Sequence, residues 1–449
     1  IGDGNDTYYT IASQNEWEVG VGTYNPSGVS SSWVQLGSDI DGEATGDLSG
    51  GIVSLSDDGT IMAIGAPYND DGPGSNAGHV RVYEYSGGSW SQKGADIDGE
   101  AADDESGTSV SLSSDGSIVA IGAHYNDGTG SNAGHVRVYE YSGGSWSQKG
   151  ADIDGEAASD QSGRSVSLSS DGTIVAIGAQ INAGGGAASG HVRVYEWNSG
   201  TSAWGQKGAD IDGEAADDES GISVSLSDDG SRVAIGAYLN DGTDSNAGHV
   251  RVYEWNGGTS AWDQKGADID GEAGDDYSGY SVSLSSDGSR VAIGARGNDG
   301  SFSAAGHVRV YEYSGSSWGQ IGADIDGEAA SDQSGLGVSL SSDGSRVAIG
   351  ASKNDGTGSN AGHVRVYEYS GGSWSQKGAD IDGEAAIDQS GYSVSLSSDG
   401  SIVAIGARKN DGTGSDAGHV RTFVRATLAR DTVLESSNLG NKISTTGTS

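Results

Sequence analysis

Acidic side chains are the most frequent groups in this sequence that could do chemistry. The chain carries 64 Asp and Glu against 23 Lys and Arg, which gives a net charge of −41. Some of the acids stand at alternate positions of a recurring Asp-x-Asp-x-Glu segment, where several carboxylate oxygens could converge on one cation, as calcium requires. The candidate metal ligands are Asp96, Asp98, Glu100, Asp152, Asp154 and Glu156. The alternative is a solvated acidic rim whose Asp and Gly residues make turns. Calcium is the only cofactor that this pattern favours.

Groups for covalent or acid–base catalysis form no motif. The chain has no Cys, which excludes a thiol nucleophile and a zinc–thiolate site, and no serine nucleophile motif appears in a suitable context. Seven of its eight His recur in equivalent Gly-His-Val-Arg segments. Residues at the same position of seven sequence repeats lie in seven different places in the fold and cannot converge on one metal. We therefore expect each of these His to pack against the neighbouring repeat. We therefore expect a protein that is not an enzyme; the alternative is an active site in an axial pocket.

The elements that position these groups repeat along the chain. The Gly-His-Val-Arg segment places His at 79, 135, 191, 249, 307, 363 and 419, and Asp-Ile-Asp-Gly-Glu-Ala also occurs seven times. The period of about 57 residues lies just beyond the range typical of solenoids and propellers. The hydrophobic fraction of 34% and the 79 Gly therefore belong to a repeat protein and not to a disordered chain.

One copy contains four strand patterns. Polar and apolar residues alternate over 109–113, a β-branched apolar run covers 118–123, Val alternates with longer side chains over 135–140, and 145–149 is short and polar. Asp115-Gly116 predicts a tight turn between the first two strands. Four antiparallel strands per copy and seven copies predict an all-β fold, a seven-bladed β-propeller whose core lies between blades.

The two ends of the chain complete each other. No Trp-containing fourth strand follows His419, whereas Trp33 near the N-terminus matches the fourth-strand Trp of the other copies. We therefore expect the last blade to take three strands from 391–424 and its fourth from the N-terminal 32–37, which closes the ring. Residues 21–24 also resemble a third strand and could compete for that place. The expected domains are an N-terminal segment 1–31, a single propeller 32–424 and a C-terminal tail 425–449.

The copy resembles an FG-GAP repeat, the unit of integrin α-subunit propellers and of many secreted proteins. The resemblance rests on 106–112, 119–123 and 133–139 and covers about 39–424. Ser-Gly replaces the namesake Phe-Gly in every copy. The family holds calcium between the first two strands, but 114–117 offer one carboxylate in a tight turn, too few oxygens for calcium. That calcium function is not carried over.

Two positions break the sevenfold pattern near the expected axis. The residues after each Ser-Gly are Gly51, Thr108, Arg164, Ile222, Tyr280, Leu336 and Tyr392, and those at the start of the loop after the second strand are Pro67, His124, Gln180, Tyr238, Arg296, Ser352 and Arg408. A constant frame with varying side chains can bind an asymmetric ligand; the alternative is drift at exposed sites. The ligand-binding candidates are Arg164, Tyr280, Tyr392, Thr108, Ile222, Leu336, His124, Arg296 and Arg408.

Charge and fold indicate the class of partner. A pI near 4.1 disfavours nucleic acid and anionic lipid, because phosphate groups would be repelled. No apolar run approaches the roughly 20 residues of a membrane span, and the first residue is Ile. We expect a secreted or cell-surface binding and adhesion module that recognises an extracellular protein or glycan through its acidic loop face. The alternative is a self-assembling structural subunit of an extracellular layer or filament.

Overall fold

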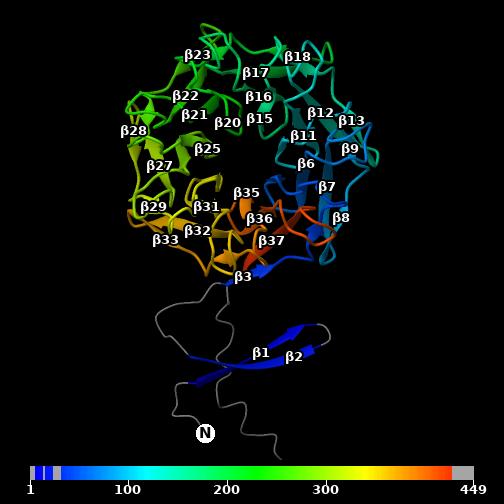
Figure 1. Cartoon of the computed structure of the whole chain (residues 1–449), viewed down its shortest axis with the longest axis vertical. Helices are drawn as coiled ribbons and strands as arrows, with labels where there is room; N and C mark the ends of the chain where they lie inside the picture. Colours follow the sequence, from blue (N-terminus) through cyan, green and yellow to red (C-terminus); the bar gives the residue numbers. More distant parts are fainter. Residues whose placement is uncertain (1–5, 14–15, 24–31, 427–449) are drawn as a thin grey trace, which may run out of the picture. The chain divides into compact units, whose positions relative to one another are not determined.

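The computed structural model describes residues 6–13, 16–23 and 32–426. It divides into two units, Ile1–Ser32 with Ala426–Ser449, and Trp33–Arg425. In the first unit β1 (Asp6–Ser13) pairs antiparallel with β2 (Glu16–Thr23). The second unit is a ring of seven antiparallel sheets (Figure 1). The ranges above contain strands but no helix, and so no helix long and apolar enough to cross a membrane.

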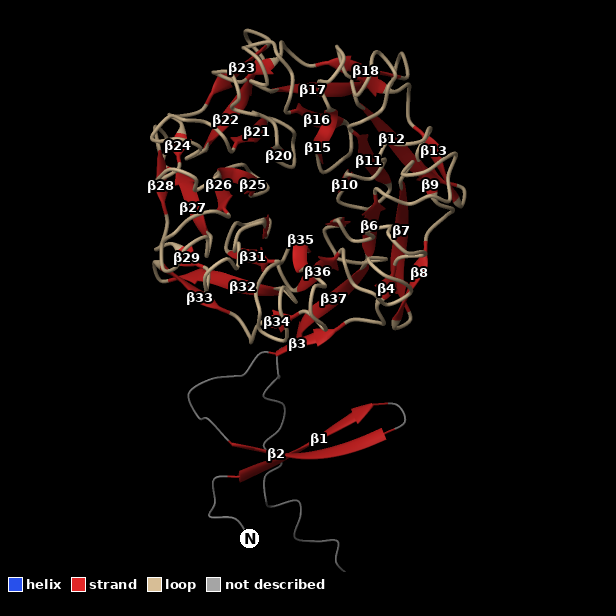
Figure 2. Ribbon diagram, viewed as in Figure 1, coloured by secondary structure: helices blue, strands red, loops and turns tan. Residues whose placement is uncertain are grey.

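The sheets follow one another around the ring in chain order, and each has its first strand next to the central opening (Figure 2). Blade one has β5 (Ile52–Leu55), β6 (Ile61–Ala66), β7 (His79–Ser86), β8 (Ser89–Gln92) and β9 (Ile97–Asp98). Blade two has β10 (Ser109–Leu112), β11 (Ile118–Ala123), β12 (His135–Ser142), β13 (Ser145–Gln148) and β14 (Ile153–Asp154). Blade three has β15 (Ser162–Leu168), β16 (Ile174–Ala179), β17 (His191–Asn198), β18 (Ala203–Gln206) and β19 (Ile211–Asp212). Blade four has β20 (Ser223–Leu226), β21 (Arg232–Ala237), β22 (His249–Asn256), β23 (Ala261–Gln264) and β24 (Ile269–Asp270).

The remaining blades keep the same order. Blade five has β25 (Ser278–Leu284), β26 (Arg290–Ala295), β27 (His307–Tyr313), β28 (Trp318–Gln320) and β29 (Ile325–Asp326). Blade six has β30 (Gly337–Leu340), β31 (Arg346–Ala351), β32 (His363–Ser370), β33 (Ser373–Gln376) and β34 (Ile381–Asp382). Blade seven has β35 (Ser390–Leu396), β36 (Ile402–Ala407), β37 (His419–Ala426), β3 (Ser32–Gln35) and β4 (Ile40–Asp41). The predicted seven-bladed propeller is confirmed.

The N-terminal strand closes the ring, as predicted. Strand β3 pairs with β37 as the fourth strand of blade seven, and β4 pairs with the other end of β37. The competing segment 21–24 does not take this place, because β2 pairs with β1 up to Thr23. The indole N–H of Trp33 donates to the carbonyl of Lys377 in blade six at 2.7 Å. Trp146 makes the equivalent bond to Lys93 at 2.6 Å, so the closing strand uses the same contact as an internal blade.

The core consists of seven apolar layers, one between each pair of adjacent blades. Between blades two and three, Val136 and Val138 pack against Val166, Leu168 and neighbouring apolar residues. Each blade has its two faces covered in this way, which explains why β11 is buried at all six positions. The central strands therefore need continuous apolar runs, whereas an outer strand such as β13 is mostly exposed and polar, which keeps the hydrophobic fraction of the whole chain modest.

Each blade has a short fifth strand that the sequence interpretation placed in a connection. Strand β14 pairs with the start of β12 through Val136 and Ile153. Ile153 is buried and belongs to the layer between blades two and three. The segment after the fourth strand is therefore part of the sheet and the core, and it fixes the position of the loop that follows.

A belt of backbone hydrogen bonds runs around the axis at the turns between the first and second strands. The amide of Asp57 donates to the carbonyl of Ser114, and the bonding continues from turn to turn until Ser398 donates to Asp57. In the turn of blade two, Asp115 Oδ1 accepts from the hydroxyl groups of Ser113 and Ser117 and from the Ser117 amide. These turns hold the ring together at this end of the axis.

Candidate functional site

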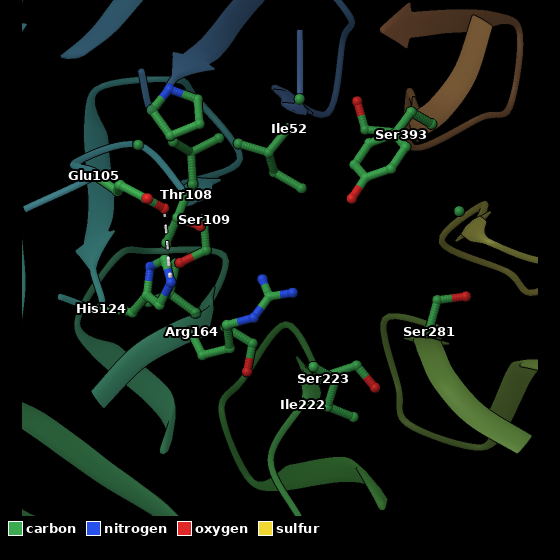
Figure 3. A pocket seen from close by; sticks show the side chains of 18 of the residues that line it. Ile52, Glu105, Thr108, Ser109, His124, Arg164, Ile222, Ser223, Ser281 and Ser393 are labelled. Carbon is green, nitrogen blue, oxygen red and sulfur yellow. Dashed lines mark ion pairs between the residues drawn. The ribbon is translucent and has the colours of Figure 1, made fainter. Parts of the chain in front are cut away.

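An axial pocket of about 520 Å³ opens at the end of the ring opposite these turns. Its lining comes from the starts of the first strands and from the loops after the second strands, and every blade contributes (Figure 3). We call this cavity the axial pocket. A concave site lined by apolar and polar groups from several elements is the usual form of a small-molecule site.

The structure brings together most of the ligand-binding candidates. The residues that line the axial pocket are Thr108, His124, Arg164, Ile222, Tyr280, Leu336, Tyr392 and Arg408. Arg296 is not among the lining residues; its guanidinium carbon lies 4.0 Å from the ring centroid of Tyr280 and supports that ring from outside. The first variable position of every repeat therefore lines the cavity, and the second does so in blades one, two, three and seven.

A third variable position, which the sequence interpretation missed, also borders the axis. It precedes each Ser-Gly by one residue, at Leu48, Glu105, Gln161, Glu219, Tyr277, Gln333 and Gln389. All seven have positive φ, between 53° and 57°, in the left-handed region that non-glycine residues rarely adopt. Leu48, Glu105 and Gln161 line the pocket. The available signal was variation between repeats next to an invariant Ser-Gly.

Arg164 is the cation at the centre of the pocket. Its guanidinium points from blade three into the open space (Figure 3). Among the described residues no carboxylate lies within ion-pair distance of it. By contrast, the strand Arg of every blade is held by a carboxylate, as Arg193 is by Glu156 at 3.6 Å. Arg164 is therefore available to an anionic group from outside.

Other cations outside the repeated framework gather at the same end of the ring. They occupy the variable loop positions after the second strands of blades five to seven: Arg296, Lys353, Arg408 and Lys409. The acids at variable positions around the axis are Glu105 and Glu219. In a chain with a net charge of −41, the axis is thus an exception to the acidic composition. That exception favours an anionic ligand group at the axis.

Two Arg–Tyr stacks form the wall near blades five and seven. The guanidinium of Arg408 lies 3.6 Å from the ring centroid of Tyr392, and its Nε donates to Gln389 at 2.9 Å. Tyr280 packs edge-on against Tyr238, with ring centroids 5.4 Å apart. These contacts hold the two pocket-lining Tyr rings in place, so that they can receive a flat ligand face without reorganisation.

A Glu–His pair lies in the opposite wall. Glu105 Oε2 is 3.8 Å from His124 Nε2 (Figure 3). Burial raises the pKa of Glu105, although a hydrogen bond from Tyr68 and the charge of Arg164 oppose this effect. Burial and the charge of Arg164 lower the pKa of His124 to about 3, so its imidazole is neutral near pH 7. A cleft that shifts two adjacent titratable groups is a candidate for acid–base chemistry.

The six candidate metal ligands are divided among different places. Glu100 and Asp152 come together with His135, whereas Asp96 faces His79 and Glu156 faces His191. Asp98 and Asp154 are the second residues of β9 and β14 and belong to none of these three groups. The acids of one connection thus divide between two successive blades instead of meeting at one point.

Comparisons with known proteins support the fold. No family model and no curated protein matches the chain. A solved structure of a “putative 6-phosphogluconolactonase” from Bacteroides uniformis is similar, with 12% identity, a TM-score of 0.55 and coverage of 78% of this chain and 90% of that one. The hydrazine synthase of Kuenenia stuttgartiensis is similar with 12% identity, a TM-score of 0.52 and coverage of 88% and 98%. The propeller is therefore supported, and the FG-GAP identity is not confirmed.

These neighbours correct one expectation. The sequence interpretation held that the protein is not an enzyme, but the same architecture occurs in proteins named as enzymes. At 12% identity the likeness shows the fold alone. The expectation that the protein is not an enzyme is nevertheless no longer justified. It depended on missing sequence motifs, and such motifs are not needed in a site whose residues come from separate segments of the chain. The Glu105–His124 pair illustrates this, because its residues come from two loops of blade two that are separate in sequence.

Proposed function

We propose that this propeller is a secreted or cell-surface binding module that takes the acidic group of a glycan into its axial pocket. One observation carries the proposal: Arg164 points, without a carboxylate partner among the described residues, into a cavity of a strongly acidic protein. An unpaired guanidinium in a concave site is suited to a carboxylate, which it binds with two parallel hydrogen bonds. The resemblance to repeats of secreted proteins supports the extracellular location.

The rest of the pocket complements a sugar that carries such a group. Tyr280 and Tyr392 offer aromatic faces on which the apolar side of a sugar ring can stack. Gln161 and Gln180 line the same cavity, and the amide of Gln180 donates to Gln161 at 3.1 Å. The side-chain amides of Gln161 and Gln180 and the carboxylate of Glu105 can form hydrogen bonds with the hydroxyl groups of a sugar. Cation, rings and amides together favour an acidic saccharide over a neutral one.

The experiment compares oligosaccharides rich in uronic acids with neutral ones of the same length, by calorimetric titration of the full chain. We expect the acidic ligands to bind and Arg164→Ala to weaken binding at least tenfold, about 1.4 kcal/mol, with Arg164→Lys in between. The control is Arg232→Ala, which removes a cation paired with Glu254 at the opposite end of its blade. Equal binding of neutral and acidic ligands, or unchanged affinity in Arg164→Ala, would contradict the proposal; binding of acidic peptides alone would reassign the ligand.

A second candidate function is hydrolysis in the same pocket, which the Glu105–His124 pair favours. Glu105 is a carboxyl group with a raised pKa, suited to accept a proton from an attacking water. Arg164 can hold a phosphate group of the substrate. We therefore test 6-phosphogluconolactone, following acid release at constant pH. Hydrolysis that Glu105→Gln abolishes and the exposed control Glu140→Gln retains would establish catalysis, whereas a rate equal to that of buffer would reject this substrate class.

A further inference from the structure

Seven groups, each of one Glu, one His and one Asp, lie between the blades, away from the axial pocket. In each group one oxygen of the Glu, one oxygen of the Asp and one nitrogen of the His lie within 4.8 Å of one another. The His starts the third strand of a blade, the Glu comes from the connection that enters that blade, and the Asp follows its fourth strand. Five groups are Glu43–His79–Asp96, Glu100–His135–Asp152, Glu156–His191–Asp210, Glu214–His249–Asp268 and Glu384–His419–Asp39, and there are two more.

The His of each group is buried, and its Nδ1 faces an acid. His79 is 1% exposed, and neither of its ring nitrogens has a hydrogen-bond partner. The buried nitrogen without a partner is Nε2 in His135, His249, His363 and His419. The Nδ1 of His79 lies 3.8 Å from Glu43 Oε2. The same nitrogen faces the Asp in other copies, at 3.9 Å between His191 and Asp210 Oδ2. A buried imidazole without partners is costly, because it has lost its bonds to water.

Outer partners orient both acids so that one oxygen of each faces the His. The Arg two residues after the His binds the other oxygen of the Glu, as Arg137 Nη1 does with Glu100 Oε1 at 3.5 Å. The Gln four residues before the Asp binds its other oxygen, as Gln148 Nε2 does with Asp152 Oδ1 at 2.6 Å. Such outer bonds, which fix ligand orientation, are typical of metal sites.

The net charge of each group favours a cation. The two carboxylates outweigh the single Arg by one negative charge. A divalent cation would thus offset repulsion between the acids and give the imidazole a partner.

We propose that each Glu–His–Asp group binds one zinc-type divalent transition ion, seven in all. A His nitrogen with two carboxylates is a zinc donor set, whereas calcium takes oxygen ligands. The nearer acid lies 3.8 to 4.0 Å from the His nitrogen, and all three ligand atoms lie within 4.8 Å of one another, whereas a tetrahedral site with bonds of about 2.1 Å needs roughly 3.4 Å. The acids must therefore move inward by roughly 0.5–1.4 Å, which their partly exposed side chains can do.

Such an ion would join parts of the chain that are distant in sequence. In the closing blade Asp39, from the N-terminal side, meets His419 and Glu384. Asp41 Oδ1 also lies 4.0 Å from His419 Nδ1 and offers a fourth ligand there. Zinc at this group would bind residues next to β3 and within β4 to the rest of the last blade, so the proposal extends to how the ring is closed and does not depend on the axial ligand.

The test counts bound ions by native mass spectrometry of the full chain, titrated with zinc and, separately, with calcium. We expect up to seven zinc ions on the unaltered chain and one fewer on both Glu100→Gln and Asp152→Asn, because each removes a ligand from the same group. The matched control Asp127→Asn changes an exposed loop acid whose oxygen caps the Asn132 amide, and should keep all seven.

Three outcomes would overturn the proposal. They are no zinc bound at concentrations that saturate typical protein sites, an equal count for calcium and zinc, and a count that Glu100→Gln and Asp152→Asn leave unchanged. Because both variants alter partly exposed side chains, far-ultraviolet circular dichroism should show an intact fold. A second readout is the melting temperature, which zinc should raise and a chelator restore.

Discussion

Deleting residues 1–38 tests how the ring is closed. The deletion removes β3, the bond from Trp33 Nε1 to Lys377 and the bond from the Leu36 amide to Thr422, both 2.7 Å long. It also removes the Trp33 indole from the apolar layer that contains Phe423. The bond from Trp90 Nε1 to the Leu36 carbonyl, 2.9 Å long, is also lost. Three hydrogen bonds and a half-buried indole together amount to about 3–6 kcal/mol, before the β3–β37 pairing is counted.

The assay is thermal unfolding with a measurement of mass in solution. A ring of ~390 residues unfolds with an entropy of about 0.8 kcal/mol/K, so the melting temperature should fall by about 4 °C or more. Strand β37 would also present an open edge, which promotes association. Deleting 1–31 keeps β3 and serves as the control, with no expected change. A shortened chain that melts like the full one and stays monomeric would refute this closure.

Three further predictions follow from the same structure. The free energy of unfolding should decline as the pH falls from about 6.5 to 4. Burial lowers the pKa of the third-strand His residues in the folded protein, that of His135 to about 4, so in this range protons bind the unfolded chain more readily than the folded one. Urea midpoints that stay constant over this range would refute the prediction. Hydrogen bonds from Ser117 and Ser113 outweigh burial and lower the pKa of Asp115, so its stabilisation should persist above pH 3.8 and disappear below; Asp115→Ala should cost about 1 kcal/mol at pH 7 and little at pH 2 by denaturant titration. Replacing Arg164, Tyr280 and Tyr392 by Ala should abolish ligand binding in calorimetry and keep the fold, although loss of the Arg stacks should cost about 0.5–1 kcal/mol at each Tyr; retained affinity with a larger loss of stability would make them packing residues.

The sequence predicted the parts of the fold that local patterns determine. The apolar run 118–123 matches β11, because a strand with both faces buried needs an uninterrupted apolar segment. Trp33 identified the closing strand, because each fourth strand uses its indole to reach the preceding blade. Because the same strand patterns occur in seven repeats, the complete ring could be predicted from them.

The sequence did not reveal features that need contacts between separate segments. The two-residue strand β14 is too short to show alternation. Glu105 was overlooked because its place at the axis follows from a positive φ that its residue type does not predict. Glu100 and Asp152 lie one repeat apart and meet only because successive connections pass the same His. Side-chain groups of this kind depend on blade packing, which no local spacing encodes.

A crystal structure of the full chain with the tightest-binding acidic oligosaccharide tests the axial site directly. We expect a carboxylate of the ligand within hydrogen-bond distance of the Arg164 guanidinium, with a sugar ring against Tyr280 or Tyr392 in the axial pocket. A ligand bound on the outer rim, with the axial pocket empty and Arg164 unengaged, would contradict this proposal.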